Sequence, residues 1–257
     1  AHSSYVVVDP KGGVLGQVGA FLQRRGYQIK VFNSIDFSKS MHYNPLSYIR
    51  NEADILKFVN ALITNTKGEG KEGDPFWTKA ETLLYCALIA YIIFEGPAED
   101  RNMNTLVDMI SGMEVKEDDE NYKNAVDYMF DSLAKRKPDC FAVKQYRKFK
   151  LSSGKTAKSI VVTAAVRLAT FNIPQYAEIT RKDEMDFGSL GEKKKAIFCL
   201  IPVDDSSMNY LVGMLYTQCF QALYRRADAK YNGRLPVPVR VIQDEWANVA
   251  QPESYPK

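Results

Sequence analysis

The sequence predicts an α/β protein in which a parallel sheet is interrupted by a long helical insertion. Residues 5–8 and 28–32 are short runs rich in Val, Ile, Tyr and Phe, and an amphipathic segment separates them, as in a β-α-β unit. Residues 51–188 then show helical spacing with no convincing strand. Runs typical of buried strands return at 195–202 and 237–243. A sheet that begins, stops and resumes is most simply explained by an inserted helical domain.

Composition sets limits on function without identifying it. A chain of 257 residues that is 46% hydrophobic and 25% charged is typical of a globular protein with one core and an inserted subdomain. The formal net charge is only +3, so affinity for nucleic acid must come from a local patch. Four cysteines fit no zinc spacing and indicate reduced structural thiols in a cytoplasmic compartment. The chain opens without an initiator Met or a signal peptide, and we expect it to be part of a longer protein.

The first predicted strand ends at Asp9-Pro10-Lys11-Gly12-Gly13. A helix over 14–25 follows and ends at Gly26, and the second strand is predicted over 28–32. Asp9 and Lys11 therefore lie at a strand's carboxyl end, where open α/β sheets bind ligands. We expect both residues to contribute to a cofactor site. Asp-Pro is equally typical of a turn, so the structural interpretation stays open.

Several helices are predicted within the insertion. The best-marked one has Asp74 as N-cap and Pro75 at its first position, and it continues to Gly96. Its apolar part, 83–94, is too short to span a bilayer. Further helices are predicted over 104–111, 122–135, 143–151 and 157–171.

Gly154-Lys155-Thr156 resembles the end of a phosphate-binding P-loop. That motif requires a glycine five positions before Gly154, and Phe149 stands there. A P-loop also follows a buried strand, whereas the preceding segment is basic and helical in pattern. We therefore interpret Ser152-Ser153 as a capping turn before the next helix.

The same region contains a cluster of basic residues interleaved with Tyr146 and Phe149. Such a cluster can contact phosphates and stack the bases of single-stranded DNA, or receive an acidic protein partner. It is also typical of the solvated face of a helix. The candidate binding residues are Lys144, Arg147, Lys148, Lys150, Lys155 and Lys158, with Arg167 nearby.

The last strand run is followed directly by two acids, Asp244 and Glu245. It comes after a strand over 195–202, a helix over 208–226 capped by 204–206, and a linker over 231–236. Two acids at a strand's carboxyl end form a Walker B arrangement. In a nucleotide hydrolase Asp244 would hold Mg²⁺ through water, and Glu245 would orient the attacking water. An ordinary strand that ends in a solvated turn is the structural alternative.

Five motifs occur in order along the chain: Ser4-Tyr5-Val6-Val7-Val8-Asp9-Pro10-Lys11-Gly12, Tyr43-Asn44-Pro45-Leu46, Asp74-Pro75-Phe76-Trp77, Gly154-Lys155-Thr156-Ala157-Lys158-Ser159-Ile160 and Asp244-Glu245-Trp246-Ala247-Asn248. Together they resemble the TraG/TraD-like coupling proteins of conjugation, which are the DNA-transfer ATPases of type IV secretion systems. The resemblance is closest to the versions on Gram-positive mobile elements, and it spans essentially the whole chain.

The resemblance implies a partial RecA-like P-loop NTPase sheet at 1–50 and 189–257, with an inserted all-alpha domain at 51–188 that includes Gly154-Lys155-Thr156. It implies a full-length homo-hexamer at the cytoplasmic face of the membrane that uses ATP and Mg²⁺. That motor would recruit the relaxase in its relaxosome and move single-stranded DNA toward type IV secretion channel components. The part given by this chain is expected to be soluble.

Departures from the family pattern limit what this chain does by itself. The family's P-loop lies upstream of the segment that resembles Ser4 to Gly12, and its membrane helices lie further upstream. Gln243 stands where the family usually has Leu, and Trp246 where it usually has Phe. We predict that the chain alone neither binds nor hydrolyses ATP.

Two other functions stay open. One is a non-enzymatic module that recruits a relaxase or another substrate protein, and its binding would survive Asp244→Ala. The other is a different RecA-like ATPase, such as a septal DNA translocase or a hexameric helicase. Such an enzyme would share the last strand but should lack the helical insertion.

Overall fold

The computed structural model describes residues 3–66, 74–116, 119, 122–152, 154–203 and 209–243. The chain divides into two compact units. Unit 1 comprises residues 1–48 and 178–257, and unit 2 comprises residues 49–177.

Unit 1 contains a parallel sheet, as predicted. In the order β2-β3-β1-β4, every pair of neighbouring strands is parallel. Every residue of β3 is buried, in agreement with its apolar sequence. Val8 of β1 is in register with Cys199 of β3 and with Gln243 of β4. The strands are β1 (Ser4–Pro10), β2 (Gln28–Asn33), β3 (Lys195–Ile201) and β4 (Val239–Gln243).

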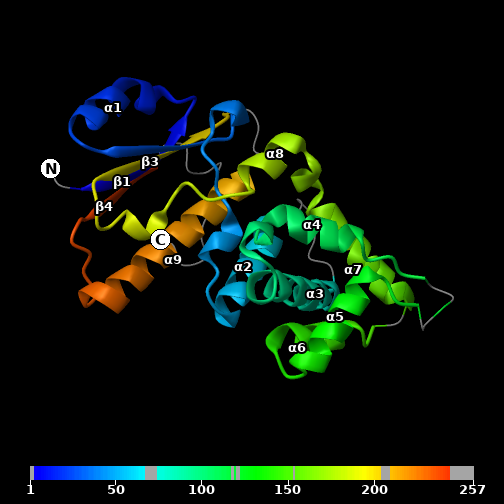
Figure 1. The fold of residues 1–257 in the computed structure, drawn as a ribbon. Helices are drawn as coiled ribbons and strands as arrows, with labels where there is room; N and C mark the ends of the chain where they lie inside the picture. Colours follow the sequence, from blue (N-terminus) through cyan, green and yellow to red (C-terminus); the bar gives the residue numbers. More distant parts are fainter. Residues whose placement is uncertain are drawn as a thin grey trace. The chain divides into compact units, whose positions relative to one another are not determined.

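Two helices cover opposite faces of this sheet (Figure 1). Helix α1 (Gly13–Arg24) connects β1 to β2 and packs on the face that carries Val7 and Phe198. Helix α9 (Asn209–Tyr231) connects β3 to β4 and covers the other face. The two crossovers run in opposite directions along the sheet, so right-handed connections place their helices on opposite faces.

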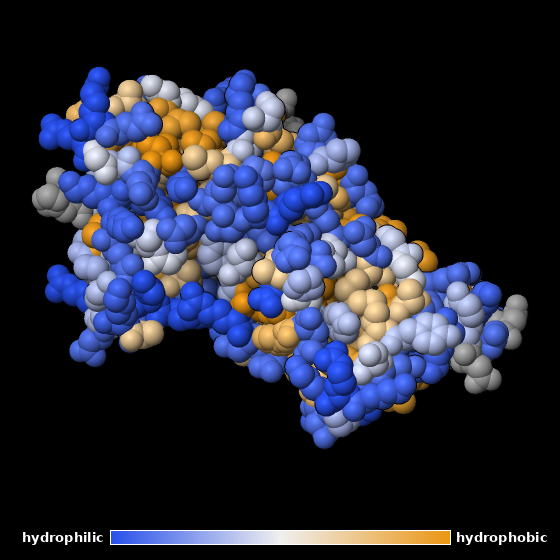
Figure 2. Space-filling view, in the orientation of Figure 1, coloured by the Kyte–Doolittle hydropathy of each residue, from blue (hydrophilic) through white to orange (hydrophobic). Residues whose placement is uncertain are grey.

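The α1 face of the sheet is only partly covered. Figure 2 shows hydrophobic residues at the surface beside α1. In α1 only Gly19 is fully buried. The partly buried apolar residues that pack against this part of the core are Tyr5, Val14, Leu15, Val18, Leu22, Ile29 and Val31.

Strand β4 differs from the fully buried strand that its sequence predicted. Its residues alternate between partly buried and exposed, and Ile242 is 46% exposed. The physical reason is its position: within the described residues β4 pairs only with β1, so it lies at an edge of the sheet.

Unit 2 is helical, and no strand occurs among the residues of it that the structure describes. The predicted helices are confirmed with small shifts of their ends. The structure adds α2, a helix for which no separate range was predicted. The helices are α2 (Glu52–Asn65), α3 (Pro75–Phe94), α4 (Met103–Ser111), α5 (Ala125–Arg136), α6 (Phe141–Phe149) and α7 (Gly154–Arg167), and α8 (Pro174–Ile179) leads back to unit 1. Short 3₁₀ helices occur at η1 (Phe37–Lys39), η2 (Pro45–Tyr48), η3 (Ala98–Asp100), η4 (Ala169–Asn172) and η5 (Phe187–Ser189).

Helix α3 is the central helix of unit 2. The Asp74 side chain caps it by accepting a hydrogen bond from the Phe76 N–H at 2.9 Å, and Pro75 occupies the first turn. It packs against α2, α4, α6 and α7. By length and composition α3 is the one described helix that could cross a membrane, but most of its apolar window is buried inside the protein. This burial is typical of a core helix.

The cysteines are free thiols. Cys86, Cys199 and Cys219 are buried, and Cys140 is partly exposed. Burial raises the pKa of Cys86 and of Cys219 to about 12, so both thiols stay protonated near neutral pH. These properties agree with the structural role predicted for them.

Candidate functional site

The carboxyl edge of the sheet is the first candidate site. Because the strands are parallel, β1, β3 and β4 all end at this edge. Gln243 of β4 is level with Val8, one residue before Asp9. Asp244 and Glu245 follow Gln243 in the sequence and lie outside the described residues. Their roles toward Mg²⁺ and water stay predictions.

Asp9 is fully buried at the end of β1. Its Oδ1 accepts a hydrogen bond from the Val14 N–H at 3.0 Å, and its Oδ2 accepts one from the Leu15 N–H at 2.7 Å. The carboxylate therefore caps the amino terminus of α1, the end of a helix that attracts anions. A direct bond from Asp9 to a cofactor would have to replace these contacts. The placement favours the turn interpretation of Asp9-Pro10.

Lys11 is exposed in the turn between β1 and α1. Its φ is 63° and that of Gly12 is 76°, so two successive residues are left-handed. The Lys11 N–H donates to the Ile201 carbonyl of β3 at 3.3 Å. At Gly12 a Cβ would lie 3.2 Å from Leu200, which favours glycine there. Contacts with β3 and with Asp9 therefore hold the turn in place. The turn places Lys11 at the edge of the sheet.

The described residues fit part of a nucleotide site. Lys11 offers a cation to phosphate oxygens, whereas Asp9 already occupies the amino terminus of α1. Among the described residues no cluster of three or more His, Cys, Asp or Glu side chains could hold a metal ion. A Mg²⁺ site at this edge would depend on Asp244. The chain also contains no Gly-x-x-x-x-Gly-Lys-Ser/Thr sequence that could enclose the phosphates.

Polar contacts join the two segments that lead into and out of unit 2, which we call the junction segments (residues 42–48 and 178–189). The Tyr43 N–H donates to the Ile179 carbonyl at 2.8 Å, and the Glu184 N–H donates to the His42 carbonyl at 2.9 Å. His42 Nδ1 lies 2.6 Å from Glu184 Oε2. The Tyr48 ring stacks on Phe187 with centroids 4.5 Å apart. Sequence reasoning missed these contacts, which join residues more than 130 positions apart.

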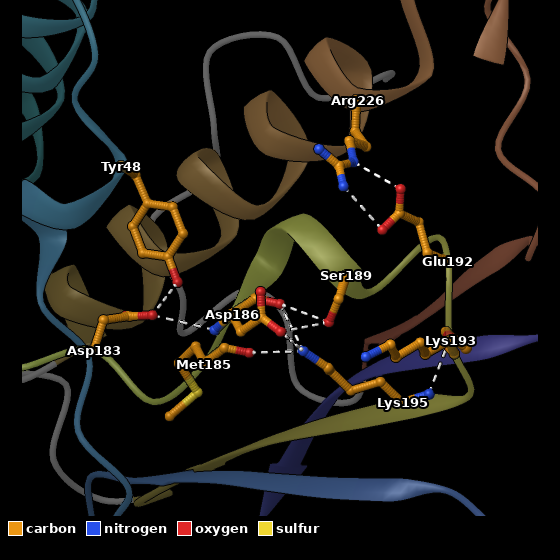
Figure 3. A network of polar contacts seen from close by, with 10 residues as sticks. Tyr48, Asp183, Met185, Asp186, Ser189, Glu192, Lys193, Lys195 and Arg226 are labelled. Carbon is orange, nitrogen blue, oxygen red and sulfur yellow. Dashed lines mark hydrogen bonds and ion pairs between the residues drawn. The ribbon is translucent and has the colours of Figure 1, made fainter. Parts of the chain in front are cut away.

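Figure 3 shows how the second junction segment is attached to the sheet. Lys195, the first residue of β3, is fully buried, and its Nζ donates to the Met185 and Asp186 carbonyls at 3.2 and 2.6 Å. Nζ also lies 3.0 Å from Asp186 Oδ2. Burial lowers the pKa of Lys195, although the bond to Asp186 opposes this change. Beside it, Tyr48 donates to Asp183 Oδ2 at 2.7 Å, and burial raises the pKa of Asp183. The sequence did not predict this network, because a lysine at the start of a strand is ordinarily exposed.

The second candidate site is the basic surface of α6 and α7. Lys144, Arg147 and Lys148 are spaced at i, i+3 and i+4 along α6, and all three are exposed. Lys144 lies 3.6 Å from Asp139, and Arg147 donates to the Pro138 carbonyl at 3.2 Å.

The remaining basic residues have different surroundings. Lys155 and Lys158 are exposed on α7. Lys150 instead pairs with the buried carboxylate of Asp127 at 2.9 Å, and Arg167 pairs with the buried Glu81 at 2.8 Å. Arg167 is largely buried in its pair, whereas the paired Lys150 side chain stays exposed, so six of these seven cations are accessible.

Tyr146 and Phe149 are not available to stack bases. Both are buried. Tyr146 stacks on Phe130 of α5 with centroids 3.9 Å apart, and its hydroxyl donates to Asp127 Oδ1 at 2.9 Å. The suggestion that these aromatics meet single-stranded DNA is therefore wrong. The helical period explains why: positions 146 and 149 share the apolar side of α6, opposite the basic one.

Gly154-Lys155-Thr156 forms the first turn of α7. It follows helix α6 instead of a strand, and it lies in unit 2, apart from the sheet sequence. Its context therefore agrees with the rejection of a P-loop. Ser153 of the predicted capping turn lies outside the described residues, as do residues 204–206.

Comparison with known proteins gives a family match over nearly the whole chain. The family model described as "Type IV secretory system Conjugative DNA transfer" matches residues 1–256. The type IV secretion system-coupling protein VirD4 of Bartonella henselae is 24% identical over 240 residues, which cover 90% of this chain and 36% of that protein. VirD4 of Bartonella quintana is 24% identical over 188 residues, which cover 72% of this chain and 28% of that protein.

Solved structures of the plasmid coupling protein TrwB share the fold. TrwB with the non-hydrolysable ATP analogue ADPNP gives a TM-score of 0.63 at 14% identity, covering 98% of this chain and 52% of that one. TrwB with ADP and Mg²⁺ gives a TM-score of 0.57 at 15% identity, covering 94% of this chain and 56% of that one. The sheet is thus of the RecA-like type found in TrwB, with substantial helical content. The chain spans about half the length of these structures and about a third of the VirD4 proteins.

Proposed function

This chain belongs to the type IV secretory system conjugative DNA transfer family, and we propose that it is the cytoplasmic part of an ATP-driven coupling protein. In this proposal the whole protein links the relaxosome to the type IV secretion channel and moves single-stranded DNA. The observation that carries the proposal is the family match over residues 1–256, which includes the sheet, the helical segment and the Asp244-Glu245 pair. Such a match argues against a septal translocase or a helicase.

The nucleotide site is proposed at the carboxyl edge of the sheet. Lys11, which is exposed at this edge, would meet phosphate oxygens. Asp244 would hold Mg²⁺ through water, and Glu245 would orient the attacking water. TrwB has been solved with an ATP analogue and with ADP and Mg²⁺, which supports ATP and Mg²⁺ as cofactors of the whole protein.

The domain boundaries that we propose are 1–50 and 189–257 for the nucleotide-binding domain and 51–188 for the all-alpha domain. The whole protein is proposed to be a homo-hexamer at the cytoplasmic face of the cell membrane, of the type found on Gram-positive mobile elements. The five sequence motifs taken together support this type.

ATP hydrolysis tests the proposal. At the length of its relatives, the protein should hydrolyse ATP, and Glu245→Gln should lower kcat by about 100-fold or more while nucleotide still binds. Glu99→Gln, an exposed substitution of the same kind on η3, should leave kcat unchanged. The present chain alone should show no ATPase activity. An active present chain would contradict our site assignment, and an inactive longer protein would contradict the proposed function.

The basic surface is proposed to contact single-stranded DNA. Binding of labelled single strands should weaken steeply with salt, because phosphate contacts release counterions. Lys144→Glu/Arg147→Glu/Lys148→Glu should abolish it. A control with the same charge change, Arg24→Glu/Arg25→Glu/Arg50→Glu, alters exposed residues elsewhere and should retain binding.

A recruitment function is the second candidate, because unit 2 is a compact helical body with an accessible basic surface. If single-stranded DNA does not bind at low salt, the same surface should instead bind an acidic segment of a relaxosome protein. That binding should survive Asp244→Ala and be lost in the triple α6 variant.

A further inference from the structure

Lys11 has an unusual backbone conformation for a lysine. Three non-glycine residues of the described chain have positive φ: Lys11, Asp186 and Asn232. Asp and Asn adopt the left-handed region comparatively easily because their short polar side chains bond to nearby backbone. Lysine has no such compensation. Strain of this kind persists only where surrounding structure enforces it, and it concentrates at functional sites.

Asp9 forms hydrogen bonds with both this turn and the helix that follows it. Its carbonyl accepts a hydrogen bond from the Gly12 N–H at 3.3 Å, and its carboxylate accepts from the Val14 and Leu15 N–H groups. One buried residue therefore holds both the turn and the start of the helix that follows it. On the other side, the Ile201 carbonyl accepts from the Lys11 N–H.

The Lys11 side chain has no structural task that would explain the strain. It is exposed, and it forms no hydrogen bond or ion pair with any residue that the structure describes. It sits at the carboxyl end of β1, between the ends of β3 and β4. A glycine at position 11 would form the same turn without strain, so the turn by itself does not require a lysine there.

We propose that Asp9 is a positioning residue for ATP hydrolysis: it holds Lys11 left-handed so that the lysine ammonium meets nucleotide phosphate at the sheet edge. Asp9 itself touches no nucleotide. The inference rests on the proposed function and adds a division of labour between the two residues. It also predicts that stability and activity respond differently to substitutions at position 11.

Thermal unfolding of the present chain tests the strain. Alanine normally gives a more stable protein than glycine, but at a left-handed position the order reverses. Lys11→Gly should melt about 2–4 °C above Lys11→Ala. At the exposed, right-handed helical position Gln17, the same pair of substitutions should show the ordinary order. If Lys11→Ala melts at or above Lys11→Gly, the proposed strain is absent.

Activity of the protein at the length of its relatives tests the positioning. Lys11→Ala and Lys11→Gly should lower kcat/KM for ATP equally, by about tenfold or more, because both lack the ammonium. Lys11→Arg should retain part of the activity. Asp9→Asn, which keeps one acceptor of two, should lower kcat/KM in the wild-type background but not in the Lys11→Ala background. Additive losses would show that Asp9 acts on the fold alone and would overturn the inference.

The outcomes separate this inference from the proposed function. A wild-type protein without ATPase activity would overturn both. An active wild type whose kcat/KM is unchanged by Lys11→Ala would overturn the inference and the assignment of Lys11 to phosphate, but not the proposed DNA-transfer function. Because Lys11 is exposed, Lys11→Ala should fold. Its kcat/KM therefore tests the inference even if Asp9→Asn fails to fold.

Discussion

His42 and Glu184 form a close polar contact between the two junction segments. Glu184 Oε2 accepts from the His42 backbone N–H at 2.9 Å and lies 2.6 Å from His42 Nδ1. The backbone bond and then the imidazole bond lower the pKa of Glu184 to about 2, from an ordinary value of 4.5. Ionised Glu184 therefore stabilises the folded state. A second carboxylate, that of Glu178, lies 3.5 Å from His42 Nε2 and is more exposed.

Glu184 should make stability depend on pH in the acid range. Because its pKa is depressed on folding, the unfolded chain takes up the proton first as pH falls. The stabilisation is complete above about pH 4.5 and is lost as pH falls toward 2. The urea midpoint of wild type should exceed that of Glu184→Gln at about pH 6, and the difference should shrink across this range. A difference that stays constant with pH would contradict the assignment. Glu178→Gln should have a smaller effect.

An ion pair joins three helices of unit 2. The Arg167 guanidinium donates to Glu81 Oε2 of α3 at 2.8 Å. It also donates to the Ile63 carbonyl of α2 at 3.3 Å and to Oγ1 of Thr66, the residue that follows α2, at 3.0 Å. Glu81 is almost completely buried. Arg167 thereby links the end of α7 to α3 and satisfies the carboxyl end of α2. The sequence did not predict this ion pair, because Arg167 follows a series of basic residues that lie at the surface.

Removing Arg167 alone should lower the free energy of unfolding more than removing both Arg167 and Glu81. Arg167→Leu leaves a buried carboxylate unpaired and should reduce the free energy of unfolding by about 3–5 kcal/mol. The double variant Glu81→Leu/Arg167→Leu should recover much of this loss, because no uncompensated charge remains. Urea unfolding followed by circular dichroism measures both. Arg101→Leu, at an exposed site, should have little effect. A double variant no more stable than Arg167→Leu would rule out this explanation.

The elements were predictable where one local pattern determines them. Asp74-Pro75 marked the start of α3, and the apolar run of β3 gave a buried strand at the predicted position. Strand β4 has a similar apolar sequence but is half-exposed, because burial depends on neighbouring strands that a local pattern does not contain. Likewise α9 extends to Tyr231, five residues beyond the predicted end at Arg226. Arg226, Lys230 and Tyr231 all bond Glu192, a residue distant in sequence.

The candidate sites were only partly predictable for the same reason. The sequence placed Asp9 and Lys11 at a sheet edge correctly, because strand direction determines that edge. It did not distinguish a buried capping carboxylate from an exposed one, nor a left-handed lysine from an ordinary one. In α6 the helical period separates Tyr146 from Arg147, and the structure shows which side is buried.

The whole molecule consists of two compact units interleaved in sequence. The chain leaves the sheet after β2 and returns at β3, so two neighbouring strands flank an insertion of more than 100 residues. Contacts such as Tyr43 N–H to the Ile179 carbonyl join the two ends of this insertion within unit 1. An insertion closed at its base in this way can fold without disturbing the sheet register.

Unit 2 should therefore fold when expressed alone as residues 49–177. It has its own core around α3, where Leu84 and Leu88 are fully buried. The isolated unit should show helical circular dichroism and a cooperative thermal transition. Leu88→Asp should abolish the transition, because it buries a charge, whereas Tyr128→Asp should not, since Tyr128 is 63% exposed. If α6 and α7 carry the binding surface, unit 2 alone should bind single-stranded DNA with the salt dependence of the whole chain. A folded unit 2 without binding would place the DNA site elsewhere in the protein.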